Sequence, residues 1–125
     1  MKKTKVFGIG ILIAFPITIM TSMPALADYA AIAYSRSTGY SGYSWKHYSA
    51  TNAREGAISS CNSQGCTVEV LVENQCAALA RKRNDFSFVT TGVDSNSRSA
   101  AGNKAMAACG SNCQLVASVC SNIDN

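Results

Sequence analysis

The feature that most constrains the fold is an internal repeat whose two copies each end in a pair of cysteines. Residues 53–66 form the first copy and residues 101–113 the second, and they align with an offset of 48 positions when Cys61 is placed on Cys109. A repeat of this kind usually forms a small unit that cannot bury its apolar face alone and packs against its twin. The likeness extends into the flanking segments, so the sequence predicts one domain of two internal repeats, at about 29–74 and 76–121.

The first 27 residues have the pattern of a cleaved signal peptide. Three lysines precede an apolar run at positions 6–20, and Ala25-Leu26-Ala27 places small residues where a signal peptidase reads. The alternative is a retained membrane anchor, but the run is short and contains Pro16. We therefore expect cleavage after Ala27, export into the periplasm or the medium of a bacterium, and a mature domain of residues 28–125 that is not held in a membrane.

Net charge gives no support for nucleic-acid binding. The whole chain has 11 Lys and Arg against 7 Asp and Glu, a formal charge of +4. Three of the lysines leave with the signal peptide, so the mature chain is nearly neutral. Because binding of nucleic acid through bulk charge needs a clear basic excess, we expect no nucleic-acid partner.

Both repeats predict the same order of elements, which is strand, strand, helix, strand. The strands are expected at 29–34, 40–48 and 67–74 in the first repeat and at 76–80, 86–91 and 114–119 in the second. Ser49 and Ser97 are suited to begin the two helices, and Asn62 and Gly110 to end them. The sequence therefore predicts an α+β fold in which one largely antiparallel sheet of about six strands carries two alanine-faced helices.

Six cysteines lie in the exported part of the chain, and an even number in a small exported domain predicts disulfides. The repeat favours a bond at the end of each helix and leaves the two unmatched cysteines as a third pair. The expected bonds are Cys61–Cys66, Cys109–Cys113 and Cys76–Cys120. Metal binding is the alternative, but the chain has one histidine and no C-x-x-C spacing, so we expect no metal and no other cofactor.

Several segments together resemble a known family. They are Y-A-A-I-A-Y-S-x-S-T-G at 29–39, G-Y-S-W at 42–45, A-I-S-S-C at 57–61, C-A-A-L-A at 76–80 and the closing M-A-A-C-G-S-N-C-Q-L-V-A-S-V-C-S at 106–121. In these segments the chain is similar to domain of unknown function 4189, a family of small exported bacterial proteins. The resemblance covers residues 28–121 and implies export and a shared fold. It brings no established reaction.

The residues needed for catalysis are sparse. With every cysteine expected to be oxidised, no thiolate remains as a nucleophile. His47 is the only imidazole, and no serine motif surrounds it. Glu69 and Glu73 alternate with Val68, Val70 and Val72 on the predicted strand, and they lie about 13 Å apart by strand rise. A solvated sheet face opposite an apolar face explains this pattern better than a carboxylate pair does.

Two surfaces are candidates for binding. The first is the aromatic strand, where alternation predicts Tyr43 and Trp45 on one face and Tyr40 and Tyr48 on the other. Such rings suit a protein or a glycan, although half of them are also suited to a core. The second is the turn Arg81-Lys82-Arg83 together with Arg36 of the equivalent turn, which suits an acidic partner or simply a solvated loop.

The sequence thus favours a disulfide-stabilised interaction module of undefined biochemical role that binds another protein, such as a periplasmic inhibitor or immunity protein. The alternative is a small hydrolase that acts on envelope material, with His47 or Glu69 as its working group. The first hypothesis predicts a stable protein partner and no enzymatic activity. The second predicts activity that is lost in His47→Ala or Glu69→Gln while the fold remains.

Overall fold

The computed structural model describes residues 27–122, which form six strands and two helices. The same order of elements occurs twice along the chain. The signal peptide predicted over residues 1–27 falls outside this range, apart from Ala27. In chain order the elements are β1 (Tyr29–Ser35), β2 (Ser41–His47), α2 (Ala50–Cys61), β3 (Cys66–Glu73), β4 (Cys76–Lys82), β5 (Asp85–Asp94), α3 (Arg98–Cys109) and β6 (Cys113–Cys120). The predicted order of strand, strand, helix, strand is confirmed in both halves.

The strands form two three-stranded antiparallel sheets, with the orders β2-β1-β3 and β5-β4-β6. The α+β class is therefore confirmed, but the expected single sheet is wrong. The reason lies in the central strands: β1 and β4 are buried on both faces, since nearly every residue from 30 to 35 and from 76 to 80 is inaccessible to solvent. A helix covers only one face of each sheet, so the other face packs against the second sheet.

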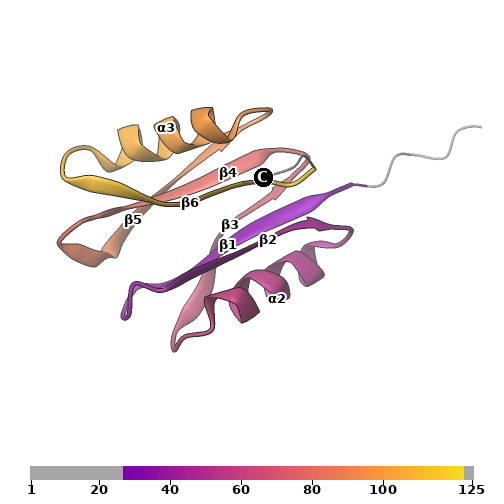
Figure 1. The fold of residues 1–125 in the computed structure, drawn as a ribbon, viewed down its shortest axis with the longest axis horizontal. Coiled ribbons are helices and arrows are strands. Elements are labelled where there is room, and N and C mark those ends of the chain that lie inside the picture. Colours follow the sequence, from indigo (N-terminus) through magenta and orange to yellow (C-terminus); the bar gives the residue numbers. More distant parts are fainter. Residues whose placement is uncertain (1–26, 123–125) are drawn as a thin grey trace, which may run out of the picture.

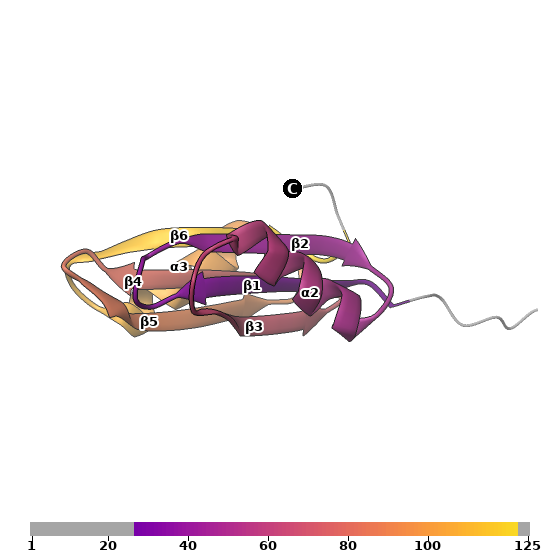
Figure 2. The ribbon, with the colours of Figure 1, turned by 90° about the horizontal axis from the view of Figure 1, so that it is seen from below.

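The result is four layers, helix on sheet on sheet on helix. Figure 1 shows α2 and α3 on the two outer sides with both sheets between them. Figure 2, turned by 90°, shows the first half lying over the second, with β1 near the middle and β2 and β3 beside it. Each half thus covers the apolar sheet face that the helix of the other half leaves open.

The layer between the sheets is the largest apolar core. It joins side chains from both halves, among them Ile32, Leu79 and Val119, all fully buried. Burying a side chain of this size contributes about 1.5–3 kcal/mol. At one end of this layer, the Tyr34 hydroxyl donates a hydrogen bond of 2.8 Å to the Phe86 carbonyl. The halves therefore depend on each other for most of their large apolar side chains.

Each helix packs on its own sheet through alanines. In the first half Ala53, Ala57 and Cys61 of α2 meet Ala31 and Ala33 of β1. The predicted caps are confirmed, because the hydroxyls of Ser49 and Ser97 accept hydrogen bonds from backbone amides in the first turns of α2 and α3. Asn62 and Gly110 end the helices at positive φ, 46° and 91°.

A β-bulge interrupts the third strand of each half at equivalent places. In β3 the register against β1 shifts at Glu69, and in β6 the register against β4 shifts at Val116, which is 47 positions later. Because one residue is inserted, the side chains before and after the bulge alternate out of step, and equivalent positions point to opposite faces of the sheet. For this reason Val68 packs on the helix side while Val70 and Val72 face the other sheet, and the expected placement of all three valines on one face is wrong.

Three disulfides join the cysteines in the expected pairs: Cys61–Cys66, Cys76–Cys120 and Cys109–Cys113. Each bond lies within one half, so no disulfide joins one half to the other. Disulfides of this density fit an oxidising environment outside the cytoplasm. Within residues 27–122, neither helix is long and apolar enough to cross a bilayer.

Candidate functional site

One end of the molecule gathers the basic residues of both halves beside two exposed phenylalanines. Contacts between the halves bring the turn after β1 against the start of β5: Arg36 Nη1 donates to the Ser87 carbonyl at 3.0 Å, and Gly39 lies against the ring of Phe86. We call this surface the basic end. It consists of Arg36, Arg81, Lys82, Arg83, Phe86 and Phe88.

Arg36 is neutralised by a carboxylate of its own half. Its Nε and Nη2 donate to the two carboxylate oxygens of Glu69 at 3.0 and 2.9 Å, a bidentate pair. These hydrogen bonds raise the pKa of the guanidinium. The bulge at Glu69 turns that side chain toward the end of β1, where Arg36 follows the strand. Arg36 is therefore committed to an internal ion pair and to the contact between halves.

Arg83 stands at the place of Arg36 in the second half, but it has no such partner. Val116 occupies the place of Glu69, so the second bulge presents an apolar side chain instead of a carboxylate. Among the described residues, the Arg83 side chain has one polar contact, a long one of 3.4 Å to Gln114 Oε1. Its side chain is exposed. Arg83 thus lacks the carboxylate partner that its equivalent, Arg36, has.

Arg81 and Lys82 are held by contacts within the protein. The Arg81 guanidinium lies 4.2 Å from the centroid of the Phe86 ring, a cation–π contact. Burial raises the pKa of the Tyr34 hydroxyl, and the positive charge of Arg81 partly opposes this effect. Lys82 Nζ donates to the Ser111 carbonyl at 2.6 Å, just beyond the end of α3, where a cation is favourable.

A groove of about 390 Å³ runs between the basic residues and the start of β5. Arg36 and Arg83 line it together with Phe86, whose ring is partly exposed. Asp85 also lines the groove, and hydrogen bonds from Ser87 lower the pKa of its carboxyl. Four cations and the two carboxylates of Glu69 and Asp85 leave this end with a net positive charge. The arrangement suits an acidic, partly apolar surface.

The predicted aromatic surface is only partly present. Tyr43 is 50% exposed, whereas Trp45 is partly buried against the core between the sheets. A bulge near the C-terminal end of β2 places Lys46 at a φ of 62°. The Lys46 Nζ lies 5.7 Å from the centroid of the Trp45 ring. Tyr40 and Tyr48 are exposed. The structure therefore brings Arg36, Arg81, Lys82 and Arg83 together, but it gives Trp45 a packing role.

Phe86 and Phe88 are exposed rings of the basic end that the sequence pattern does not single out. Their segment predicts a strand, and alternation along a strand does not separate a core ring from an exposed one. The available signal was the arrangement R-K-R-N-D-F-S-F, where two aromatic rings directly follow a basic turn. Cations beside exposed rings are a common composition at binding surfaces.

The residues considered for hydrolysis do not converge. His47 lies against Gly56 of α2, Glu69 is paired with Arg36, and Glu73 is at the opposite end of β3, opposite Tyr29. Both oxygens of the Glu69 carboxylate accept hydrogen bonds from Arg36, so this carboxylate is not free to contact a substrate. Within residues 27–122 there is also no group of three or more His, Cys, Asp or Glu that could hold a metal ion.

Comparison with known proteins decides the family. The model of the family described as Domain of unknown function (DUF4189) matches residues 29–120, which is nearly all of the described chain. The chain belongs to this family. The matched residues include both repeats of this chain and its basic end. No curated protein matches the sequence.

A solved structure shares the fold of this DUF4189 domain. The NMR structure of Rv1813c from Mycobacterium tuberculosis aligns with a TM-score of 0.57 and 25% sequence identity, and the alignment covers 88% of each chain. The likeness therefore supports the fold and a bacterial setting.

Proposed function

We propose that the protein is an exported, disulfide-stabilised interaction module whose basic end binds an acidic surface of another protein. Its place would be the periplasm or the cell exterior, and its effect would be that of an inhibitor or immunity protein, which covers a surface that its partner needs. The three disulfides and the DUF4189 fold support the first half of this proposal, a small rigid module made for an oxidising compartment.

The observation that carries the binding role is the missing counter-charge of Arg83. Its equivalent, Arg36, is paired with Glu69, while Arg83 faces solvent beside a groove and the exposed ring of Phe86. Arginine and aromatic side chains dominate the energetic centres of protein interfaces. An acidic side chain of a partner would pair with Arg83 in the way that Glu69 pairs with Arg36.

The test is capture from an envelope extract of the source bacterium by the oxidised, tagged protein, analysed by mass spectrometry. We expect a partner that wild type retains and Arg83→Glu loses, because charge reversal opposite a carboxylate lowers affinity by at least about tenfold. Binding should also weaken as salt is raised.

The matched control is Arg54→Glu, which makes the same charge change on the exposed side of α2. This variant should retain the partner as wild type does. Retention of the same proteins by wild type and Arg83→Glu would contradict the proposal. Trp45 is not a suitable test residue, because its substitution also disturbs the core between the sheets.

A further inference from the structure

A second groove, distinct from the basic end, lies between α3 and β6. Its volume is about 480 Å³, and its floor is made by Gly102 and Met106 of α3 and Leu115 of β6. Leu115 remains 45% exposed although it lines the groove. The volume is within the range of pockets that bind small molecules, about 300–1,000 Å³.

The first half contains the equivalent groove with different side chains. It lies between α2 and β3, has a volume of about 390 Å³, and is lined by Arg54 and Glu69 among others. Arg54 aligns with Gly102, 48 positions later, and Glu69 aligns with Val116, 47 positions later. The second groove therefore lacks both the long side chain and the carboxylate of the first.

Gly102 lowers the stability of α3. A glycine inside a helix is less stable than alanine by about 1 kcal/mol. A Cβ at this position would meet only the end of the Leu115 side chain, at 3.3 Å, so no backbone contact requires a glycine. The effect of Gly102 is instead to leave the floor of the groove open.

The charge lining the groove is also unbalanced. Arg98 lies at its rim, exposed, and has no ion pair among the described residues. The remaining rim residues include Ser99 and Ser118, which are small and neutral. Glu69 lines the first groove but its carboxylate pairs with Arg36, whereas no carboxylate lines the second groove. The Arg98 guanidinium is therefore available to an anionic ligand.

We propose that the groove between α3 and β6 binds a small amphiphilic carboxylate. Its apolar body lies on Gly102, Met106 and Leu115, and its carboxylate pairs with the Arg98 guanidinium, which suits a planar two-oxygen group. Arg98 and Met106 are eight residues apart on α3, about 12 Å, which is a suitable length for a short acyl chain. The site does not rest on the function proposed for the basic end.

The test is a titration of the full mature protein with decanoate, below its micelle concentration, followed by amide chemical shifts in ¹⁵N-labelled protein. We expect saturable shifts concentrated in residues 98–106 and 114–118. Arg98→Gln should weaken binding by about tenfold, since a charged hydrogen-bonded pair contributes about 1.5–3 kcal/mol. Gly102→Arg, which copies the first half, should abolish it.

Comparator ligands and variants distinguish binding in this groove from nonspecific binding of an amphiphile elsewhere on the protein. Decyltrimethylammonium has a similar chain and the opposite charge, and it should not bind at these residues. Arg83→Gln should leave decanoate binding unchanged, which excludes the basic end as the source. Equal binding of both amphiphiles, unchanged affinity in Arg98→Gln, or shifts centred on residues 81–88 would overturn the proposal. Arg98 is exposed, so Arg98→Gln should fold normally. The test therefore remains decisive even if Gly102→Arg does not fold.

Discussion

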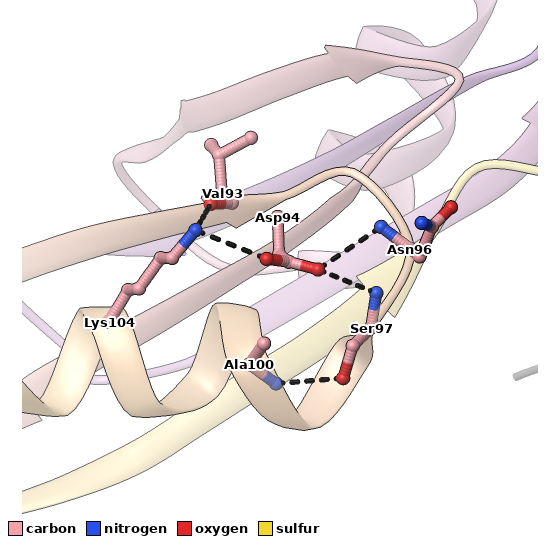
Figure 3. A network of polar contacts seen from close by, with 6 residues as sticks. All are labelled: Val93, Asp94, Asn96, Ser97, Ala100 and Lys104. Atoms are coloured by element: carbon pink, nitrogen blue, oxygen red, sulfur yellow. Dashed lines mark hydrogen bonds and ion pairs between the residues drawn. The ribbon is translucent and has the colours of Figure 1, made fainter.

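At the scale of single residues, Asp94 organises the start of α3. Asp94 is the last residue of β5, and Figure 3 shows its carboxylate between Lys104 of α3 and the loop residues Asn96 and Ser97. One oxygen accepts hydrogen bonds from the amides of Asn96 and Ser97, at 3.1 and 2.9 Å, and the other accepts from Lys104 Nζ at 3.1 Å. One side chain thus fixes the loop before the helix and the helix itself.

These contacts predict a pH dependence. The hydrogen bond from Asn96, followed by those from Lys104 and Ser97, lowers the pKa of the Asp94 carboxyl. A carboxyl whose pKa is lower in the folded state stabilises the fold above its unfolded pKa of about 3.9, and this contribution is lost as the pH falls through the folded pKa. Asp94→Asn should therefore lower the Tm at pH 7, and the difference from wild type should shrink below about pH 4.

Thermal unfolding followed by circular dichroism between pH 7 and pH 2.5 measures this difference. Glu55→Gln is a suitable control, because Glu55 is an exposed carboxylate of α2 with no ion pair among the described residues. A Tm difference for Asp94→Asn that stays constant down to pH 2.5 would show that the charge of Asp94 is not the cause.

At the scale of elements, the second strand of each half lets its helix approach closely. A Cβ on Gly42 would lie 2.0 Å from the Cys61 amide nitrogen, and one on Gly92 would lie 2.3 Å from the Ala101 carbonyl oxygen. Two residues from each glycine, a hydroxyl donates to a helix carbonyl: Ser44 to Ala53, and Thr90 to Ala105. The close approach brings each helix near enough for these bonds to form.

Glycines 92 and 102 should therefore respond oppositely to alanine. Gly92→Ala places a methyl against backbone atoms of α3 that cannot move separately, so we expect a loss of about 3 kcal/mol or more. In Gly102→Ala the new methyl meets only a flexible side chain, and alanine favours the helix by about 1 kcal/mol, so we expect a small gain or no change. Urea unfolding of both variants measures these differences. Equal losses would contradict this account of the helix packing.

The elements themselves could be predicted because their signals are local. The hydroxyls of Ser49 and Ser97, the alanine faces and the turns are all visible in the sequence. The bulges at Glu69 and Val116 could not be predicted, because a bulge depends on the register with a neighbouring strand. The division into two sheets was missed for a related reason: strand pairing within a half is local, whereas the packing of sheet on sheet is set by apolar faces far apart in the sequence.

The candidate site was predictable to a similar extent. The equivalence of Arg36 and Arg83 follows from the repeat, and the structure brings both to one end. Their different surroundings could not be foreseen, because the pairing of Arg36 with Glu69 depends on the bulge. The partial burial of Trp45 depends likewise on the second sheet, which only the assembled fold provides.

At the scale of the whole molecule, the halves are joined by the apolar layer and by few polar contacts, while each disulfide stays within a half. The Lys46 amide donates to the Ser121 carbonyl at 3.0 Å, and Tyr34 reaches Phe86 at the other end. A domain of this size has a free energy of unfolding of about 5–15 kcal/mol. Covalent restriction of the unfolded chain is therefore a large share of its stability.

The three disulfides should contribute unequally, because they close loops of different length. Cys76 and Cys120 are 44 positions apart, whereas Cys61 and Cys66 are 5 apart. The chain-entropy relation gives about 4 kcal/mol for the long loop and about 2 kcal/mol for the short one. We expect Cys76→Ala/Cys120→Ala to lower the free energy of unfolding by about twice as much as Cys61→Ala/Cys66→Ala. Urea unfolding with a common m-value measures both, and equal losses would mean that native packing around the sulfurs, and not restriction of the unfolded chain, determines their contribution.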